Sequence, residues 1–99
     1  MTEAEYRKGI LDYARVYVQI PRFYEWMKAA PSDRVREVKI LEQCSDTMMT
    51  EEEFTRRRRA LWKEFTDEDW DYTIKTAGHN QGRYQLKKIR EEIQGNKRS

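Results

Sequence analysis

Side chains able to carry out nucleophilic or acid–base chemistry are scarce in this chain of 99 residues. It has one histidine, His79, one cysteine, Cys44, and only three serines. A nucleophile needs a general base and a group that orients that base, and no serine stands in such a setting. Cys44 ends an apolar segment, which predicts a buried thiol. A Cys44–His79 dyad is the alternative that the sequence leaves open.

Metal and phosphate sites also lack their usual residues. One cysteine and one histidine are too few for a standard zinc site, and there is no glycine-rich phosphate loop. An acidic cluster opens one predicted helix: Asp67, Glu68, Asp69 and Asp71. Acidic side chains complement the dipole at a helix start, whereas a hard cation requires a loop-like set of oxygens. We therefore expect no enzyme activity, no cofactor and no bound metal.

Four consecutive arginines, Arg56 to Arg59, form the most conspicuous pattern in the sequence. A guanidinium presents a rigid fork of donors that fits a phosphate or a carboxylate, so the run suggests a partner-binding surface. On a helical wheel, Arg56, Arg59 and Lys63 cluster opposite the apolar side. The competing interpretation is a solvated face, because a glutamate stands four residues before each of the first two arginines.

Arg58 differs from its neighbours because it falls on the apolar side of the same wheel. A guanidinium in that position must find an acidic partner inside the fold, stack on Trp62, or project to a partner molecule.

A second basic segment lies near the end of the chain, after an acidic predicted helix. Together the two could form a helix-turn-helix, with the basic helix along the major groove of DNA. The connecting loop of five residues is longer than the usual three to four, and the pI of about 8.7 is low for a DNA-binding domain. The candidate binding residues, for a protein or a nucleic acid, are Arg56, Arg58, Arg59, Lys63, Arg83, Lys87 and Lys88.

Tyr6, Tyr13 and Tyr17 form a stripe on the first predicted helix, which Tyr24 extends. The stripe coincides with the apolar side of that helix, which favours core packing. Stacking on nucleic-acid bases and a protein interface are the alternatives.

The hydrophobic periodicity predicts a succession of helices. Thr-x-x-Glu capping boxes begin at Thr2 and Thr50, Thr66 caps a further helix, and Pro21 ends or kinks the first. Residues 35–44 also suit a strand around 38–40, but we expect a helix because a lone strand has no partner. The predicted helices span residues 3–20, 22–30, 35–44, 50–65, 67–77 and 83–94, with loops at 45–49 and 78–82.

The composition predicts a small folded domain with a thin core. Hydrophobic residues make up 37% of the chain and charged residues 38%, but the net charge of only +2 causes little self-repulsion. Three Trp, six Tyr and three Phe supply large buried areas. We predict an all-α single domain over residues 1–94, with four to six short helices around an aromatic-rich core, and a frayed basic tail over 95–99.

These features favour a non-catalytic regulatory protein, an inhibitor or adaptor that binds another protein. Its size and composition are common among phage and mobile-element proteins, and a homodimer stays open. The alternative is a small nucleic-acid-binding regulator that uses the basic helix faces at 56–63 and 83–90. No apolar run approaches the roughly 18 residues that span a membrane. The lone cysteine and the acidic start without an apolar segment predict the cytoplasm.

Overall fold

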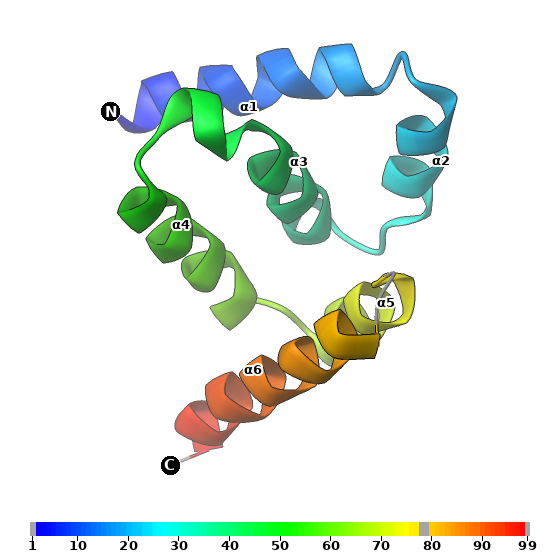
Figure 1. The fold of residues 1–99 in the computed structure, drawn as a ribbon, viewed down its shortest axis with the longest axis vertical. Coiled ribbons are helices and arrows are strands. Elements are labelled where there is room, and N and C mark those ends of the chain that lie inside the picture. Colours follow the sequence, from blue (N-terminus) through cyan, green and yellow to red (C-terminus); the bar gives the residue numbers. More distant parts are fainter. Residues whose placement is uncertain (1, 78–79, 99) are drawn as a thin grey trace.

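The computed structural model describes residues 2–77 and 80–98, and these residues form helices and no strand (Figure 1). The predicted all-α class is therefore confirmed, and the strand alternative around residues 38–40 is excluded. In the described part of the chain the helices are α1 (Glu3–Tyr17), α2 (Pro21–Ala29), α3 (Asp33–Met48), α4 (Glu51–Lys63), α5 (Asp67–Thr76) and α6 (Asn80–Arg98).

Threonine side chains begin three of these helices, as their sequence pattern predicts. Thr2, Thr50 and Thr66 each accept a hydrogen bond from the backbone N–H three residues later, over 3.1 to 3.2 Å. At Thr66 the bond is reciprocal, because its own N–H donates to the Asp69 carboxylate over 3.0 Å. α2 begins instead with Pro21 in its first turn, where a missing N–H leaves no helical hydrogen bond unmade.

α3 lies at the centre of the fold (Figure 1). An apolar cluster packs on each of two of its sides. Ile40, Leu41 and Cys44 pack in the cluster shared with α1. Val35 and Val38 pack in the cluster shared with α4, α5 and α6. Because apolar side chains cover two sides of α3, its sequence has only a weak one-sided periodicity. This two-sided burial makes the segment hard to distinguish from a strand by its sequence.

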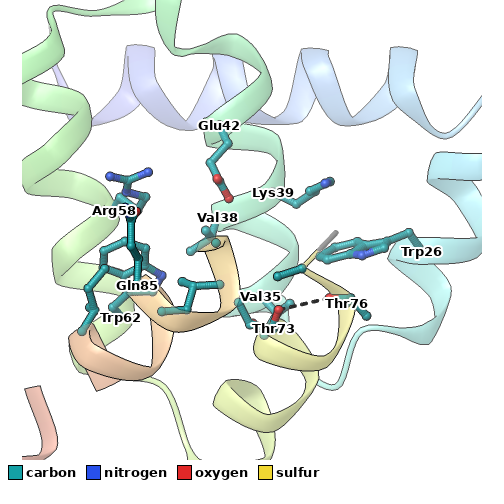
Figure 2. Close-up of a pocket in the computed structure, with 14 residues that line it drawn as sticks. Trp26, Val35, Val38, Lys39, Glu42, Arg58, Trp62, Thr73, Thr76 and Gln85 are labelled. Atoms are coloured by element: carbon teal, nitrogen blue, oxygen red, sulfur yellow. Dashed lines mark hydrogen bonds between the residues drawn. The ribbon is translucent and has the colours of Figure 1, made fainter. Parts of the chain in front are cut away.

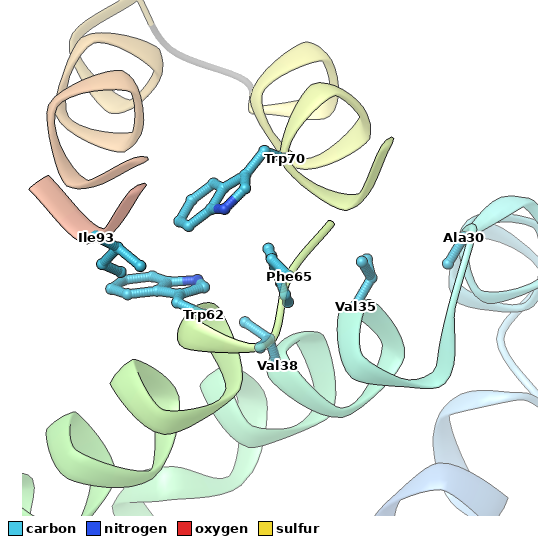
Figure 3. Close-up of a cluster of buried hydrophobic side chains, with 7 residues drawn as sticks. All are labelled: Ala30, Val35, Val38, Trp62, Phe65, Trp70 and Ile93. Carbon is cyan, nitrogen blue, oxygen red and sulfur yellow. The ribbon is translucent and has the colours of Figure 1, made fainter. Parts of the chain in front are cut away.

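Aromatic rings form the middle of the second cluster, which confirms an aromatic-rich core (Figure 3). Trp70 of α5 is fully buried. Its ring centroid lies 5.0 Å from that of Phe65 and 6.1 Å from that of Trp62. Ile93 of α6 and Val38 of α3 complete the cluster. Three large rings thus supply buried area that the few aliphatic side chains cannot.

The tyrosine stripe passes from the core to the surface along α1 and α2. Tyr6 is buried, and its hydroxyl donates to Glu37 over 3.1 Å. Tyr13 and Tyr17 are half-buried and stack with ring centroids 6.2 Å apart. Tyr24 is exposed. Core packing therefore accounts for Tyr6 and, at the edge of the cluster shared with α1, for Tyr13, but not for the exposed Tyr24.

The predicted helix boundaries differ most from the structure at four helix ends. α1 ends at Tyr17, and residues 18–20 form the turn before Pro21. The loop predicted at 45–49 is wrong, because α3 continues to Met48, whose side chain packs beside the α1 cluster. α6 begins at Asn80 and continues through Gly95 to Arg98, so it is longer than predicted at both ends. A glycine within a helix costs only about 1 kcal/mol, which the rest of a long helix readily offsets.

Candidate binding site

Two of the predicted binding residues serve the fold itself. Arg59 of α4 forms an ion pair with Glu92 of α6, with 2.8 Å between nitrogen and oxygen. Arg83 turns back toward the end of α5 and donates to the backbone carbonyls of Ala77 and Lys75. These guanidinium groups therefore satisfy acceptors within the chain, and both residues are less available to an outside phosphate or carboxylate.

Four other predicted residues are exposed, on two different helices. Arg56 and Lys63 lie on α4, and Lys87 and Lys88 lie on α6. The Lys88 nitrogen lies 5.1 Å from the ring centroid of Tyr84 on the same helix. Lys87 lines a concavity that also holds the acidic side chains of Asp67, Asp71 and Glu91.

The predicted glutamate pairing of the arginine run is confirmed at one of its two positions. Glu53 pairs with Arg57 four residues later, over 3.2 Å. Arg56 also pairs with Glu53, over 3.7 Å, rather than with the predicted Glu52. One carboxylate therefore serves two neighbouring guanidinium groups.

Arg58 stacks between two aromatic rings of its own helix. Its guanidinium carbon lies 4.6 Å from the ring centroid of Phe54 and 4.6 Å from that of Trp62. Among the described residues no carboxylate lies within 4 Å of it, so stacking on Trp62 is the predicted alternative that the structure selects. The rings compensate part of the desolvation of the charge, but they accept no conventional hydrogen bond.

Arg58 lies in the wall of a hollow of about 360 Å³, to which five helices contribute (Figure 2). We call it the Arg58 hollow. Its apolar wall comes from Trp26, Val35, Val38, Trp62, Leu86 and Ile89. Its charged side chains are Arg58 of α4 and Lys39 and Glu42 of α3, and Figure 2 shows Glu42 between the two cations.

Three buried polar atoms in the described part of the chain have no hydrogen-bond partner, and all three belong to residues that line this hollow. They are Arg58 Nε, Trp62 Nε1 and Thr73 Oγ1. An unsatisfied buried group costs about 1–3 kcal/mol, so such atoms are uncommon in folded proteins. Their concentration beside one hollow makes this hollow the candidate binding site.

The charges in the hollow influence one another without direct pairing. Desolvation by the surrounding protein raises the pKa of Glu42. The positive charges of Arg58 and Lys39 counteract only part of that rise. No ion pair within 4 Å joins Glu42 to either cation in the described residues. The Lys39 nitrogen lies 5.3 Å from the ring centroid of Trp26. Each cation therefore rests on an aromatic ring.

The sequence patterns do not predict Lys39, Glu42 or Trp26 as site residues. The spacing of Glu42 could have indicated it. Val35, Val38 and Glu42 stand at positions i, i+3 and i+7, so all three lie on one side of a helix. A charged residue that continues an apolar stripe indicates a place where that stripe meets something polar. Nothing in the sequence indicated that Arg58, from another helix, lies across from it.

Two members of the acidic cluster at the start of α5, Asp67 and Asp71, pair with side chains of α6. Arg90 donates to Asp71 over 2.8 Å and to Asp67 over 3.1 Å, and Gln94 also donates to Asp67. The start of α5 therefore lies beside the second half of α6, as in an antiparallel helical hairpin. A helix-turn-helix has helices that diverge from the turn at a large angle, so these contacts do not favour the predicted DNA-binding motif.

Cys44 is 1% exposed, which confirms the predicted buried thiol, and burial raises its pKa. His79 lies outside the described residues, so the Cys44–His79 dyad stays an untested alternative. No group of three or more His, Cys, Asp or Glu side chains suited to a metal is found in the described residues. None of the helices there combines the length and apolar character needed to cross a bilayer.

A group of large apolar side chains is exposed at the α1–α2 corner, where α1 ends and α2 begins. Their exposed fractions range from 41% to 60%. The neighbouring Tyr17 packs on Phe23 with ring centroids 5.0 Å apart, which holds the corner in shape. The exposed residues at or near this corner are Leu11, Val16, Val18, Ile20 and Tyr24.

Comparisons of the chain with protein-family models, with curated proteins and with solved structures found no match in any of the three.

Proposed function

We propose that the protein is a non-catalytic cytoplasmic regulator, an inhibitor or adaptor, that works by binding another protein. The observation that supports this proposal is the exposed apolar surface of the α1–α2 corner. In a chain with 38% charged residues, it is unusual for four large apolar side chains within residues 16–24, namely Val16, Val18, Ile20 and Tyr24, to be exposed on a surface that meets only water. Burial against a partner contributes roughly 25 cal/mol for each Å² of apolar surface removed from water.

A protein partner agrees with the rest of the surface better than a nucleic acid does. Arg59, Arg83 and Arg90 make contacts within the chain and are less available to phosphates. Both helices also carry acidic side chains, Glu51 to Glu53 in the first turn of α4 and Glu91 and Glu92 after the basic residues at 83–90 of α6, so neither helix is purely basic. A nucleic-acid-binding regulator stays the second candidate, because Arg56 and Lys63 are both exposed on α4.

The test uses the full chain as bait in a lysate of its own host, with and without nuclease, followed by cross-linking mass spectrometry. We expect a protein partner whose cross-links map to α1 and α2 and whose recovery survives nuclease. The double variant Val18→Asp/Ile20→Asp should lose this partner. Thr55→Asp, at an exposed position of α4, is the matched control and should retain it.

Two outcomes would contradict the proposal. The first is equal recovery of the partner by the wild type and the Val18→Asp/Ile20→Asp variant, with both chains equally helical by circular dichroism. The second is recovery that depends on nucleic acid and falls steeply with salt, since the log–log slope counts the phosphates that are neutralised. Self-association of the wild type through the corner, measured by sedimentation, would mean that the partner is a second copy.

A further inference from the structure

The Arg58 hollow offers hydrogen-bond donors that the chain itself does not satisfy. No acceptor in the described residues takes a hydrogen bond from the Arg58 guanidinium, and the indole N–H of Trp62 is also without a partner although Trp62 is 7% exposed. Guanidinium and indole nitrogens only donate, so neither can satisfy the other. Arg58 Nε and Trp62 Nε1 are themselves buried atoms, so a molecule in the hollow meets chiefly the terminal nitrogens of the Arg58 guanidinium, and only acceptor atoms can pair with these.

The net charge of the side chains that line the hollow indicates which kind of anionic group would bind there. Arg58 and Lys39 contribute two positive charges and Glu42 one negative charge, which leaves one positive charge for a ligand to neutralise. A dianionic phosphate would exceed this charge and would be repelled by Glu42. A carboxylate carries one charge, and its two oxygens in a plane match the fork of a guanidinium.

The other residues that line the hollow indicate the chemical character of the rest of the ligand. Trp26, Val38, Leu86 and Ile89 present apolar surface around the charged side chains. The hollow, at about 360 Å³, lies at the lower end of the range of small-molecule sites, about 300–1,000 Å³. A compact apolar body fits both the size and the lining.

We propose that the Arg58 hollow binds a carboxylate carried on a compact apolar body, with Arg58 as the main anion contact and Lys39 as the second. Such a group occurs in a small aliphatic or aromatic acid and at the C-terminal end of a peptide with an apolar last residue. Glu42 acts against the ligand by its negative charge, so it sets the affinity. The site is distinct from the α1–α2 corner, and its test does not depend on the proposed function.

The experiment is an NMR titration of the ¹⁵N-labelled full chain with 4-phenylbutyrate, observed at the indole N–H signals of its three tryptophans. Trp26 and Trp62 line the hollow, whereas Trp70 is buried in the core and is not part of the lining. We expect the signals of Trp26 and Trp62 to shift with a common dissociation constant and that of Trp70 to move least. The neutral amide 4-phenylbutyramide is the control for the apolar body and should bind at least about tenfold more weakly.

Variants separate the anion site from general effects on folding. Arg58→Gln should weaken 4-phenylbutyrate about tenfold or more, and Lys39→Gln by a smaller factor. Glu42→Gln should strengthen binding several-fold, which is a gain that a damaged fold does not produce. Arg56→Gln, two residues from Arg58 but exposed and outside the hollow, should leave the dissociation constant unchanged.

A second arm distinguishes the two sources of the carboxylate. A short peptide with a C-terminal leucine is compared with the same peptide as its C-terminal amide. Stronger binding of the peptide acid than of 4-phenylbutyrate would assign the hollow to chain ends, and the reverse order would assign it to small acids. The proposal is overturned if neither acid shifts the Trp62 signal at millimolar concentration, if acid and amide bind equally, or if Glu42→Gln weakens binding.

Discussion

The hydroxyl of Ser32 donates a 2.8 Å hydrogen bond to the carboxylate of Asp69, which joins the start of α3 to the start of α5. Arg34 donates to the other oxygen of the same carboxylate over 3.2 Å, and so does the backbone N–H of Thr66 over 3.0 Å. Asp69 is buried. One acidic side chain therefore caps its own helix and fixes the position of that helix against the central one.

Replacing Asp69 should destabilise the protein strongly. Asp69→Ala leaves three donors without their acceptor; a buried donor left unsatisfied typically costs about 1–3 kcal/mol, whereas Arg34, whose side chain is 39% exposed, can turn to water. The measurement is urea unfolding followed by circular dichroism. Glu68→Ala is the matched control, because Glu68 occupies the same helical turn but is exposed, and it should change the free energy of unfolding by about 0.5 kcal/mol or less. Equal losses in the two variants would contradict the role assigned to Asp69.

The stability of the protein should depend on Asp69 at acid pH. Burial raises the pKa of this carboxyl, but the hydrogen bonds from Thr66, Ser32 and Arg34 lower it by more, so it lies below its ordinary value of 3.8. As pH falls below about 4, the unfolded chain takes up this proton before the folded chain does, and the stabilisation is progressively lost. The free energy of unfolding of the wild type should fall more steeply below pH 4 than that of Asp69→Asn. Parallel curves for the two proteins would show that Asp69 does not contribute to the acid transition.

The adjacent residues Arg57 and Arg56 should differ in their effect on stability. The Arg57 guanidinium lies 3.8 Å from the ring centroid of Tyr6 and pairs with Glu53 and Glu3. Its side chain is 16% exposed, whereas that of Arg56 is 74% exposed. We expect Arg57→Ala to lower the free energy of unfolding by about 1–3 kcal/mol and Arg56→Ala by less than about 0.5 kcal/mol.

Arg57→Lys provides the finer comparison at this position. Lysine retains the charge but lacks the flat guanidinium that lies on the Tyr6 ring, so part of the loss should remain. Urea unfolding of Arg57→Ala, Arg57→Lys and Arg56→Ala measures the order of their free energies of unfolding. A loss at Arg56→Ala as large as that at Arg57→Ala would mean that the stacking on Tyr6 does not stabilise the fold.

The Cys44 thiol should resist modification in the folded protein. It is buried in the cluster that joins α1 and α3, and burial raises its pKa, so little reactive thiolate is present at neutral pH. Iodoacetamide should label Cys44 about 100-fold or more slowly in the native chain than in urea, because the reaction must wait for local opening. Mass spectrometry of timed samples measures both rates. Native labelling as fast as that in urea would place the thiol at the surface.

The sequence by itself determined the helical class, several helix starts and the burial of Cys44. These features depend on interactions within about one helical turn, such as the hydrogen bonds at Thr2, Thr50 and Thr66, or on plain hydrophobicity. The sequence also allowed stacking of Arg58 on Trp62, because residues four apart on a helix are neighbours. It did not determine where the arginines find their acidic partners.

Only the tertiary structure decided that Arg59 meets Glu92, that Arg90 meets two aspartates of α5, and that Lys39 and Glu42 share a hollow with Arg58. These contacts join different helices, and the packing of the rings and of the two-sided α3 sets how those helices lie together. Ion pairs at the surface contribute little free energy and therefore follow the packing rather than direct it. Hydrogen bonds within one helical turn can be inferred from residues that are close in the sequence. Ion pairs between residues far apart in the sequence depend on how the core packs, which the pattern of a single helix does not specify.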